Sequence, residues 1–259
     1  MALNNENIFY IKEVIRNNLR NKFANYVPTS NDMPFHIRLL GKDRMALFSF
    51  IQSLNTTFGA SLFEPVAVSL ANTNEYFIFA ERQHDPGRYI SENAQNVIQE
   101  IMNKLSIGEI PNKSEEVEKI RQVCKLGQQR DIKTVKVDLF LKTKFEELFL
   151  FDLKTAKPNK SNFKDFKRTL LEWTALELYN SPHAKVNSLI AIPYNPFAPQ
   201  PYQFWTSTGM LEKEKELKVA EEFWDFIGGK GAYEDLLDCF EKVGIEMREE
   251  IDNYFLRFK

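Results

Sequence analysis

Two apolar segments separated by a short charged stretch, residues 135–154, constrain the fold more than any other part of the chain. Their sequence, VKVDLFLKTKFEELFLFDLK, predicts two β-strands joined by a tight turn. Successive side chains on a strand point to opposite faces, so each strand has one apolar face. Its residues are Val137, Leu139 and Leu141 in the first strand and Phe149, Phe151 and Leu153 in the second.

The polar residues of this hairpin are placed by the same alternation. If both apolar sets lie on one side, Asp138 must lie directly or diagonally opposite Asp152, with Phe140 facing Leu150 beside them. Directly opposed side chains have Cβ atoms about 4.5 to 5.5 Å apart. Two carboxylates at that separation can hold one divalent cation. Lys154, two residues after Asp152, shares their face.

Charged groups on a mostly apolar strand pair need compensation, because buried ions are tolerated only when they are paired or bound to metal. A hard cation such as Mg²⁺ supplies it through oxygen ligands. The alternative is a strand pair whose polar face meets solvent, with Asp152 and Lys154 as ordinary surface charges. The spacing alone leaves both interpretations open.

A second carboxylate candidate lies upstream, in the otherwise apolar segment FGASLFEPVAVSLA. A lone glutamate in such a segment is rarely buried without a partner. Glu64 therefore either completes a metal site or lies at a helix end that faces water.

Composition excludes several classes of protein. The chain has no apolar run of 18 residues, so no transmembrane helix is expected, and its N-terminus has no signal-peptide pattern. Cys124 and Cys239 are far apart and outside any CxxC spacing, which favours a reducing cytoplasm. The scattered His36, His84 and His183 argue against a zinc site and are predicted to be structural.

Positive charge is concentrated around the hairpin. The whole chain has a formal net charge of −2, but residues 119–168 contain 14 Lys and Arg against 6 Asp and Glu. A local basic excess in an acidic chain suits a protein that binds a phosphate backbone. The alternative is a solvated basic face. Residues 212–259, with 8 basic and 14 acidic residues, are a better candidate for scaffold or dimer contact than for a DNA surface.

The rest of the chain predicts one α/β domain, a central mixed β-sheet flanked by helices, with additional N- and C-terminal helices. We divide it into a helical part at about 1–58, a core at about 59–210 and C-terminal helices at about 211–259. Strands are expected at 76–82 and 186–194, with 35–40 as a short edge strand or loop and 203–209 as a further candidate strand. Helices are expected at 4–26, 42–58, 91–105, 114–127, 166–178 and 213–227, with one or two more at 233–258.

Asp138, thirteen intervening residues and then Asp152-Leu153-Lys154 have the form D-x(n)-(D/E)-x-K. Two such carboxylates can position divalent cations that polarise a scissile phosphate and lower the pKa of bound water. The lysine can stabilise charge on the phosphorus or orient the attacking water. The hairpin resembles the PD-(D/E)xK nuclease core, and its continuation to Trp173, FDLKTAKPNKSNFKDFKRTLLEW, resembles the TdeIII-like type II restriction endonucleases.

This resemblance implies a restriction-endonuclease-like fold and Mg²⁺-dependent cleavage of double-stranded DNA that leaves 5′-phosphate and 3′-hydroxyl ends. It also implies a homodimer acting at a short palindromic target of the GGNCC kind, with Glu64 at the acidic helix position common in these nucleases. Two residues depart from the motif: Val137 stands in place of proline, and Asp152 in place of the more frequent glutamate. Other hypotheses are a repair or junction nuclease of the same core, and a non-catalytic DNA-binding or assembly module.

The candidate DNA contacts surround the motif. Arginine and lysine read guanine best in the major groove, but most such side chains contact phosphates instead. The candidates after the motif are Lys157, Asn159, Lys160 and Arg168. Those near the Asp-Pro-Gly turn are Arg82, Gln83 and Arg88. Lys164, Lys167 and Arg168 are expected on the exposed side of their helix.

Overall fold

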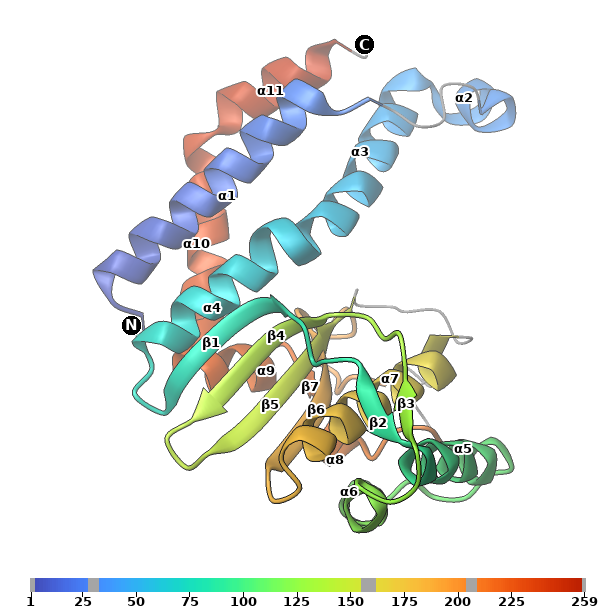
Figure 1. Ribbon diagram of the computed structural model, residues 1–259. Helices are drawn as coiled ribbons and strands as arrows, with labels where there is room; N and C mark the ends of the chain where they lie inside the picture. Colours follow the sequence, from blue (N-terminus) through green and yellow to red (C-terminus); the bar gives the residue numbers. More distant parts are fainter. Residues whose placement is uncertain (1–2, 28–32, 155–161, 204–208, 258–259) are drawn as a thin grey trace.

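A five-stranded mixed sheet forms the centre of the protein (Figure 1). The computed structural model describes residues 3–27, 33–154, 162–203 and 209–257. The strand order is β1-β4-β5-β6-β7; the pairs β1–β4 and β4–β5 are antiparallel, and the pairs β5–β6 and β6–β7 are parallel. The bounds are β1 Phe77–His84, β4 Val137–Thr143, β5 Glu147–Leu153, β6 Lys185–Ile192 and β7 Leu217–Val219.

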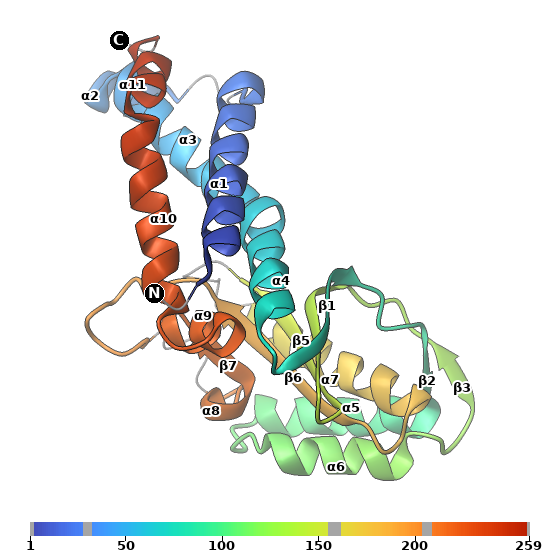
Figure 2. The ribbon, with the colours of Figure 1, turned by 90° about the vertical axis from the view of Figure 1, so that its left-hand side faces the viewer.

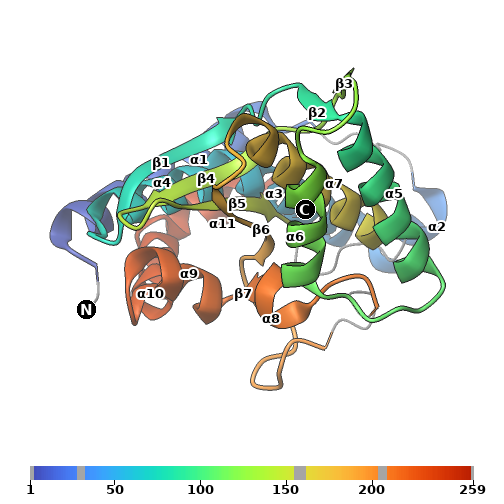
Figure 3. The same ribbon diagram turned by 60° about the horizontal axis from the view of Figure 1, so that its bottom comes forward.

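Helices cover both faces of this sheet, as the predicted α/β class requires. Leu139, Leu141 and Phe151 face one apolar layer, built with α4 (Glu64–Thr73), α9 (Glu221–Gly228) and α10 (Ala232–Glu246). Phe140 and Leu150 face the other layer. That layer contains α5 (Glu92–Ser106), α6 (Lys113–Val123) and α7 (Asn162–Asn180), which lie side by side in Figure 3.

The N- and C-terminal helices extend away from the sheet together (Figure 2). Ion pairs between α1 (Asn5–Asn25) and α10, such as Lys12 to Glu246 at 2.6 Å, hold them side by side. The remaining helices of this part are α2 (Pro34–Leu40), α3 (Lys42–Phe58) and α11 (Arg248–Leu256). No helix in the described part of the chain is long and apolar enough to cross a membrane.

The hairpin has the register that its alternation predicts, but the expected face of Val137 was wrong: this first residue of β4 packs in the layer of Phe140 and Leu150, not with Leu139 and Leu141. Leu139 pairs with Phe151, and Phe140 pairs with Leu150. Most other predicted elements are also present, including α1, α3 and α7, and Ser91 caps α5 through a 3.0 Å bond from the amide of Ala94.

Several expectations were wrong. Residues 35–40 lie in helix α2, because Pro34 at its first position presets helical φ without losing a needed N–H. Residues 213–227 are not one helix: α8 (Lys213–Glu216) stops at β7, which gains backbone partners along β6. Helix α6 spans Lys113–Val123 with Asn112 as its N-cap, so it ends four residues before the expected end at 127. The two-stranded sheet of β2 (Tyr89–Ser91) and β3 (Gln129–Asp131) was not expected. Most of the candidate strand at 203–209 lies outside the described residues.

Candidate active site

Polar residues from three neighbouring strands meet at one end of the sheet. The pairings on either side place Gln83 of β1 opposite Asp138 of β4. The β4–β5 register, continued by one residue, places Asp138 opposite Asp152. The predicted proximity of the two aspartates follows directly from the strand pairing.

Asp138 is anchored by one oxygen and presents the other. The backbone N–H of Leu153 donates to its Oδ2 at 2.8 Å, while its Oδ1 lies 3.5 Å from Nε2 of Gln83. Burial raises the pKa of Asp138 to about 7, and the neighbouring carboxylate of Asp152 adds to this increase. The negative charge of Asp138 is thus unfavourable unless a positive group, such as a metal cation, lies beside it.

This raised pKa predicts that the metal-free protein loses stability as pH rises. Between about pH 4 and pH 7 the folded state keeps a proton on Asp138 that the unfolded chain has released. Folding is therefore favoured at the lower pH, and this contribution disappears as pH rises through 7. Urea unfolding in a chelator at pH 5 and pH 8 measures it, and Asp138→Asn should show a smaller decrease. An identical pH dependence in the variant would contradict the assignment.

Glu64 is the first residue of α4, directly after the π-helical segment Gly59–Phe63. It is only 3% exposed, so it does not lie at a helix end facing water. Nε2 of Gln83 donates to both of its carboxylate oxygens, at 3.1 and 3.0 Å. Among the described residues, the Glu64 carboxylate has no other hydrogen bond or ion pair, although a buried carboxylate normally requires a positive partner.

Asp152 and Lys154 form an ion pair beside these groups. Nζ of Lys154 lies 2.5 Å from Oδ1 of Asp152. Asp152 is 3% exposed, so it is not an ordinary surface charge, whereas the Lys154 side chain stays 28% exposed. The ammonium also lies 4.8 Å from the centroid of the Phe166 ring on α7. The lysine is therefore fixed by two contacts while it remains accessible to a ligand.

A cleft of about 1050 Å³ opens onto these residues. One wall comes from α3 and the π-helical segment, and the other from the strand ends and the turn after β6. Its polar lining residues include Gln52, Asn55, Glu64, Gln83, Asp138 and Lys154. Two of the predicted carboxylates, Glu64 and Asp138, and Lys154 thus border one accessible space, and the buried Asp152 lies behind Lys154 as its ion-pair partner.

The donor set suits a hard cation. Glu64 and Asp138 both offer oxygen atoms near one amide, and Mg²⁺ is usually held by one or two carboxylates together with water and substrate phosphates. Within the described ranges, no group of three or more His, Cys, Asp or Glu side chains is placed to hold a metal ion. The three-carboxylate set of Glu64, Asp138 and Asp152 therefore stays a prediction.

The candidate DNA contacts have different outcomes. Lys157, Asn159 and Lys160 lie outside the described residues. Arg168 donates to Oε1 of Gln99 at 2.8 Å. Arg88 forms an ion pair with Asp131.

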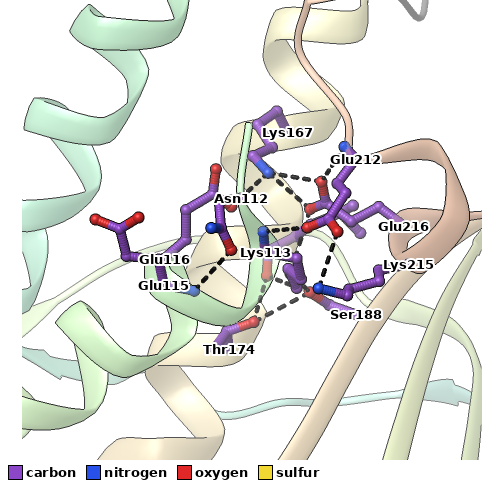
Figure 4. Close-up of polar contacts among 11 residues, drawn as sticks. Asn112, Lys113, Glu115, Glu116, Lys167, Thr174, Ser188, Glu212, Lys215 and Glu216 are labelled. Atoms are coloured by element: carbon purple, nitrogen blue, oxygen red, sulfur yellow. Dashed lines mark hydrogen bonds and ion pairs between the residues drawn. The ribbon is translucent and has the colours of Figure 1, made fainter. Parts of the chain in front are cut away.

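Lys167 was expected on the exposed side of α7, and this was wrong: it is fully buried. Its Nζ lies 2.6 Å from Glu116 of α6 and 2.7 Å from Glu216 of α8 (Figure 4). Lys113 lies beside Glu216, and its Nζ donates to Oγ of Ser188 at 2.6 Å. Burial lowers the pKa of Lys113. Lys167 is four residues after Phe163 and three before Leu170, so helical spacing could have placed it on the apolar face.

Comparison with known proteins gives consistent matches. The model of the HinfI family of type II restriction endonucleases matches residues 3–244. The type II restriction enzyme MjaII of Methanocaldococcus jannaschii is 26% identical over 249 residues, which cover 85% of this chain and 65% of MjaII. HgiCII of Herpetosiphon aurantiacus, also a type II restriction enzyme, is 24% identical over 228 residues, covering 86% of this chain and 81% of HgiCII.

Proposed function

Because this chain belongs to the HinfI family of type II restriction endonucleases, we propose that it hydrolyses phosphodiester bonds of double-stranded DNA at a short palindromic site, using Mg²⁺. The observation that carries the proposal is that Glu64, Asp138 and Lys154 line one cleft, with the buried Asp152 paired to Lys154. The 5′-phosphate products, the homodimer, the GGNCC-like target and the single nuclease domain are parts of the same proposal. So is a cytoplasmic location, which the free, buried Cys124 and Cys239 suit.

Each residue of the site has a role in this reaction. Glu64, Asp138 and Asp152 would hold Mg²⁺, which polarises the scissile phosphate and lowers the pKa of its bound water. The bond from Leu153 N–H holds Asp138 so that Oδ1 is the oxygen near Gln83 and Glu64. Lys154, oriented by Asp152, stabilises the negative charge that develops on the phosphate during attack.

Basic side chains near the cleft would bind the DNA backbone. Lys133 and Lys136 are exposed on the segment that leads into β4 and thus to Asp138. Lys157, Asn159 and Lys160 follow Lys154 in sequence and extend this basic segment. Phosphate contacts of this kind supply most of the non-specific affinity of DNA-binding proteins.

Digestion of DNA of known sequence tests the proposal. With Mg²⁺ we expect discrete fragments whose mapped ends share one short palindrome and carry 5′-phosphates. Nicks confined to branched or mismatched substrates would instead indicate a repair or junction nuclease. DNA that is bound but uncut with Mg²⁺ would overturn the nuclease assignment and favour a non-catalytic DNA-binding module.

A further inference from the structure

Gln83 interrupts the regular alternation of β1. Its φ of 54° lies in the left-handed region, which is unfavourable for a residue other than glycine. Consecutive strand side chains normally point to opposite faces. Here both Arg82 and Gln83 reach the segment around α4, with Arg82 Nη1 3.5 Å from the carbonyl oxygen of Ala60 and Gln83 bonded to Glu64.

The next residue is turned to the other face. His84 stacks on Phe140 with ring centroids 4.1 Å apart, and its Nδ1 lies 2.8 Å from Glu81, three residues earlier. Residues 81 and 84 would lie on opposite faces of a regular strand. The left-handed backbone at Gln83 therefore brings its side chain to Glu64. Unfavourable backbone conformations of this kind are concentrated at functional sites.

The amide of Gln83 joins the two carboxylates that come from different elements. Nε2 lies 3.0 and 3.1 Å from the oxygens of Glu64 on α4 and 3.5 Å from Oδ1 of Asp138 on β4. A neutral donor can approach both acids without adding a charge of its own. Within the described chain it is also the only hydrogen-bond partner of the buried Glu64 carboxylate.

We propose that Gln83 is a positioning residue, which holds the Glu64 and Asp138 carboxylates together so that one divalent cation can bind both. This inference rests on the cation site of the proposed function and adds to it a residue that sets the affinity of that site. Groups that orient metal ligands through hydrogen bonds typically change metal affinity about 10- to 100-fold.

Gln83→Gly tests this role with little risk to the fold, because glycine adopts positive φ readily. Mn²⁺ titrated into the DNA-free protein, with free Mn²⁺ measured by electron paramagnetic resonance, gives the affinity. We expect about 10-fold weaker binding or more. The unfolding midpoint is measured beside it, because the buried Glu64 carboxylate loses its hydrogen-bond partner in this variant. Gln83→Asn, which tolerates the left-handed backbone but has a shorter side chain, should weaken Mn²⁺ binding similarly.

Gln122→Ala is the matched control, since Gln122 is an exposed amide on α6 that donates only to Glu118 at 3.3 Å among the described residues. The Gln122→Ala variant should bind Mn²⁺ like the wild type.

Raised Mg²⁺ should restore DNA cleavage by Gln83→Gly but not by Asp138→Asn, because only the second variant loses a ligand. Wild-type Mn²⁺ affinity in Gln83→Gly, or no Mn²⁺ binding by the wild type, would overturn the role of Gln83. A wild type that binds Mn²⁺ but cuts no DNA would overturn only the proposed nuclease function.

Discussion

Lys154→Met is expected to reduce the rate of DNA cleavage roughly 10²- to 10³-fold or more, the usual loss when one group that stabilises developing charge is removed. Methionine removes the ammonium group but keeps an unbranched apolar side chain that can still pack near Phe166. Single-turnover cleavage of a DNA containing the mapped site measures the loss. DNA binding without divalent cation should change much less.

Lys144→Met is the matched control for this prediction. Lys144 is an exposed lysine at the other end of the same hairpin. The same substitution there should leave the cleavage rate within about a factor of two, as expected for a surface change away from the site. Because Lys154 also pairs with the buried Asp152, the unfolding midpoint of Lys154→Met must be measured beside its activity. A folded variant that cleaves at the wild-type rate would remove Lys154 from the mechanism.

The hairpin could be predicted from sequence because its apolar residues allow only one parity. A register shift of one residue would move Leu139 and Phe151 to the opposite face from their core, so Asp138 and Asp152 had to face each other. The continuation after the hairpin also identified the enzyme class, type II restriction endonuclease, which the HinfI family match confirms. Local periodicity and a long sequence match were sufficient for both conclusions.

The remaining features depend on contacts between segments far apart in sequence. Glu64 is buried because α4 packs against β1. The role of Gln83 requires a left-handed backbone conformation, which a glutamine in the sequence does not predict. Strand β7 is three residues long and forms by pairing with β6, so the helical pattern of the flanking residues concealed it. The partners of Lys167 come from α6 and α8, 51 and 49 residues away.

The buried charges around Lys167 lead to the largest expected effect on stability. Lys167→Met should lower the free energy of unfolding by about 3 to 5 kcal/mol, the usual cost of removing one partner from a buried ion pair. The variant would leave Glu116 and Glu216, whose side chains are 7% and 0% exposed, with too little positive charge. Lys113 lies 3.4 Å from Glu216 but its own charge is opposed by burial, so it offers incomplete compensation. Urea unfolding measures the change.

A second variant shows whether Lys167→Met loses stability through uncompensated charge or through lost packing, because it also removes one of the unpaired carboxylates. Lys167→Met combined with Glu216→Gln replaces one buried carboxylate by a neutral amide of the same shape, so it should recover part of the lost stability. Lys164→Met, an exposed lysine one turn earlier on α7, should change the free energy of unfolding by less than about 0.5 kcal/mol. Equal losses in Lys167→Met and the double variant would show that uncompensated charge is not the cause. The recovery is expected because the two carboxylates tie α6, α7 and α8 together only while the ammonium of Lys167 offsets their charge.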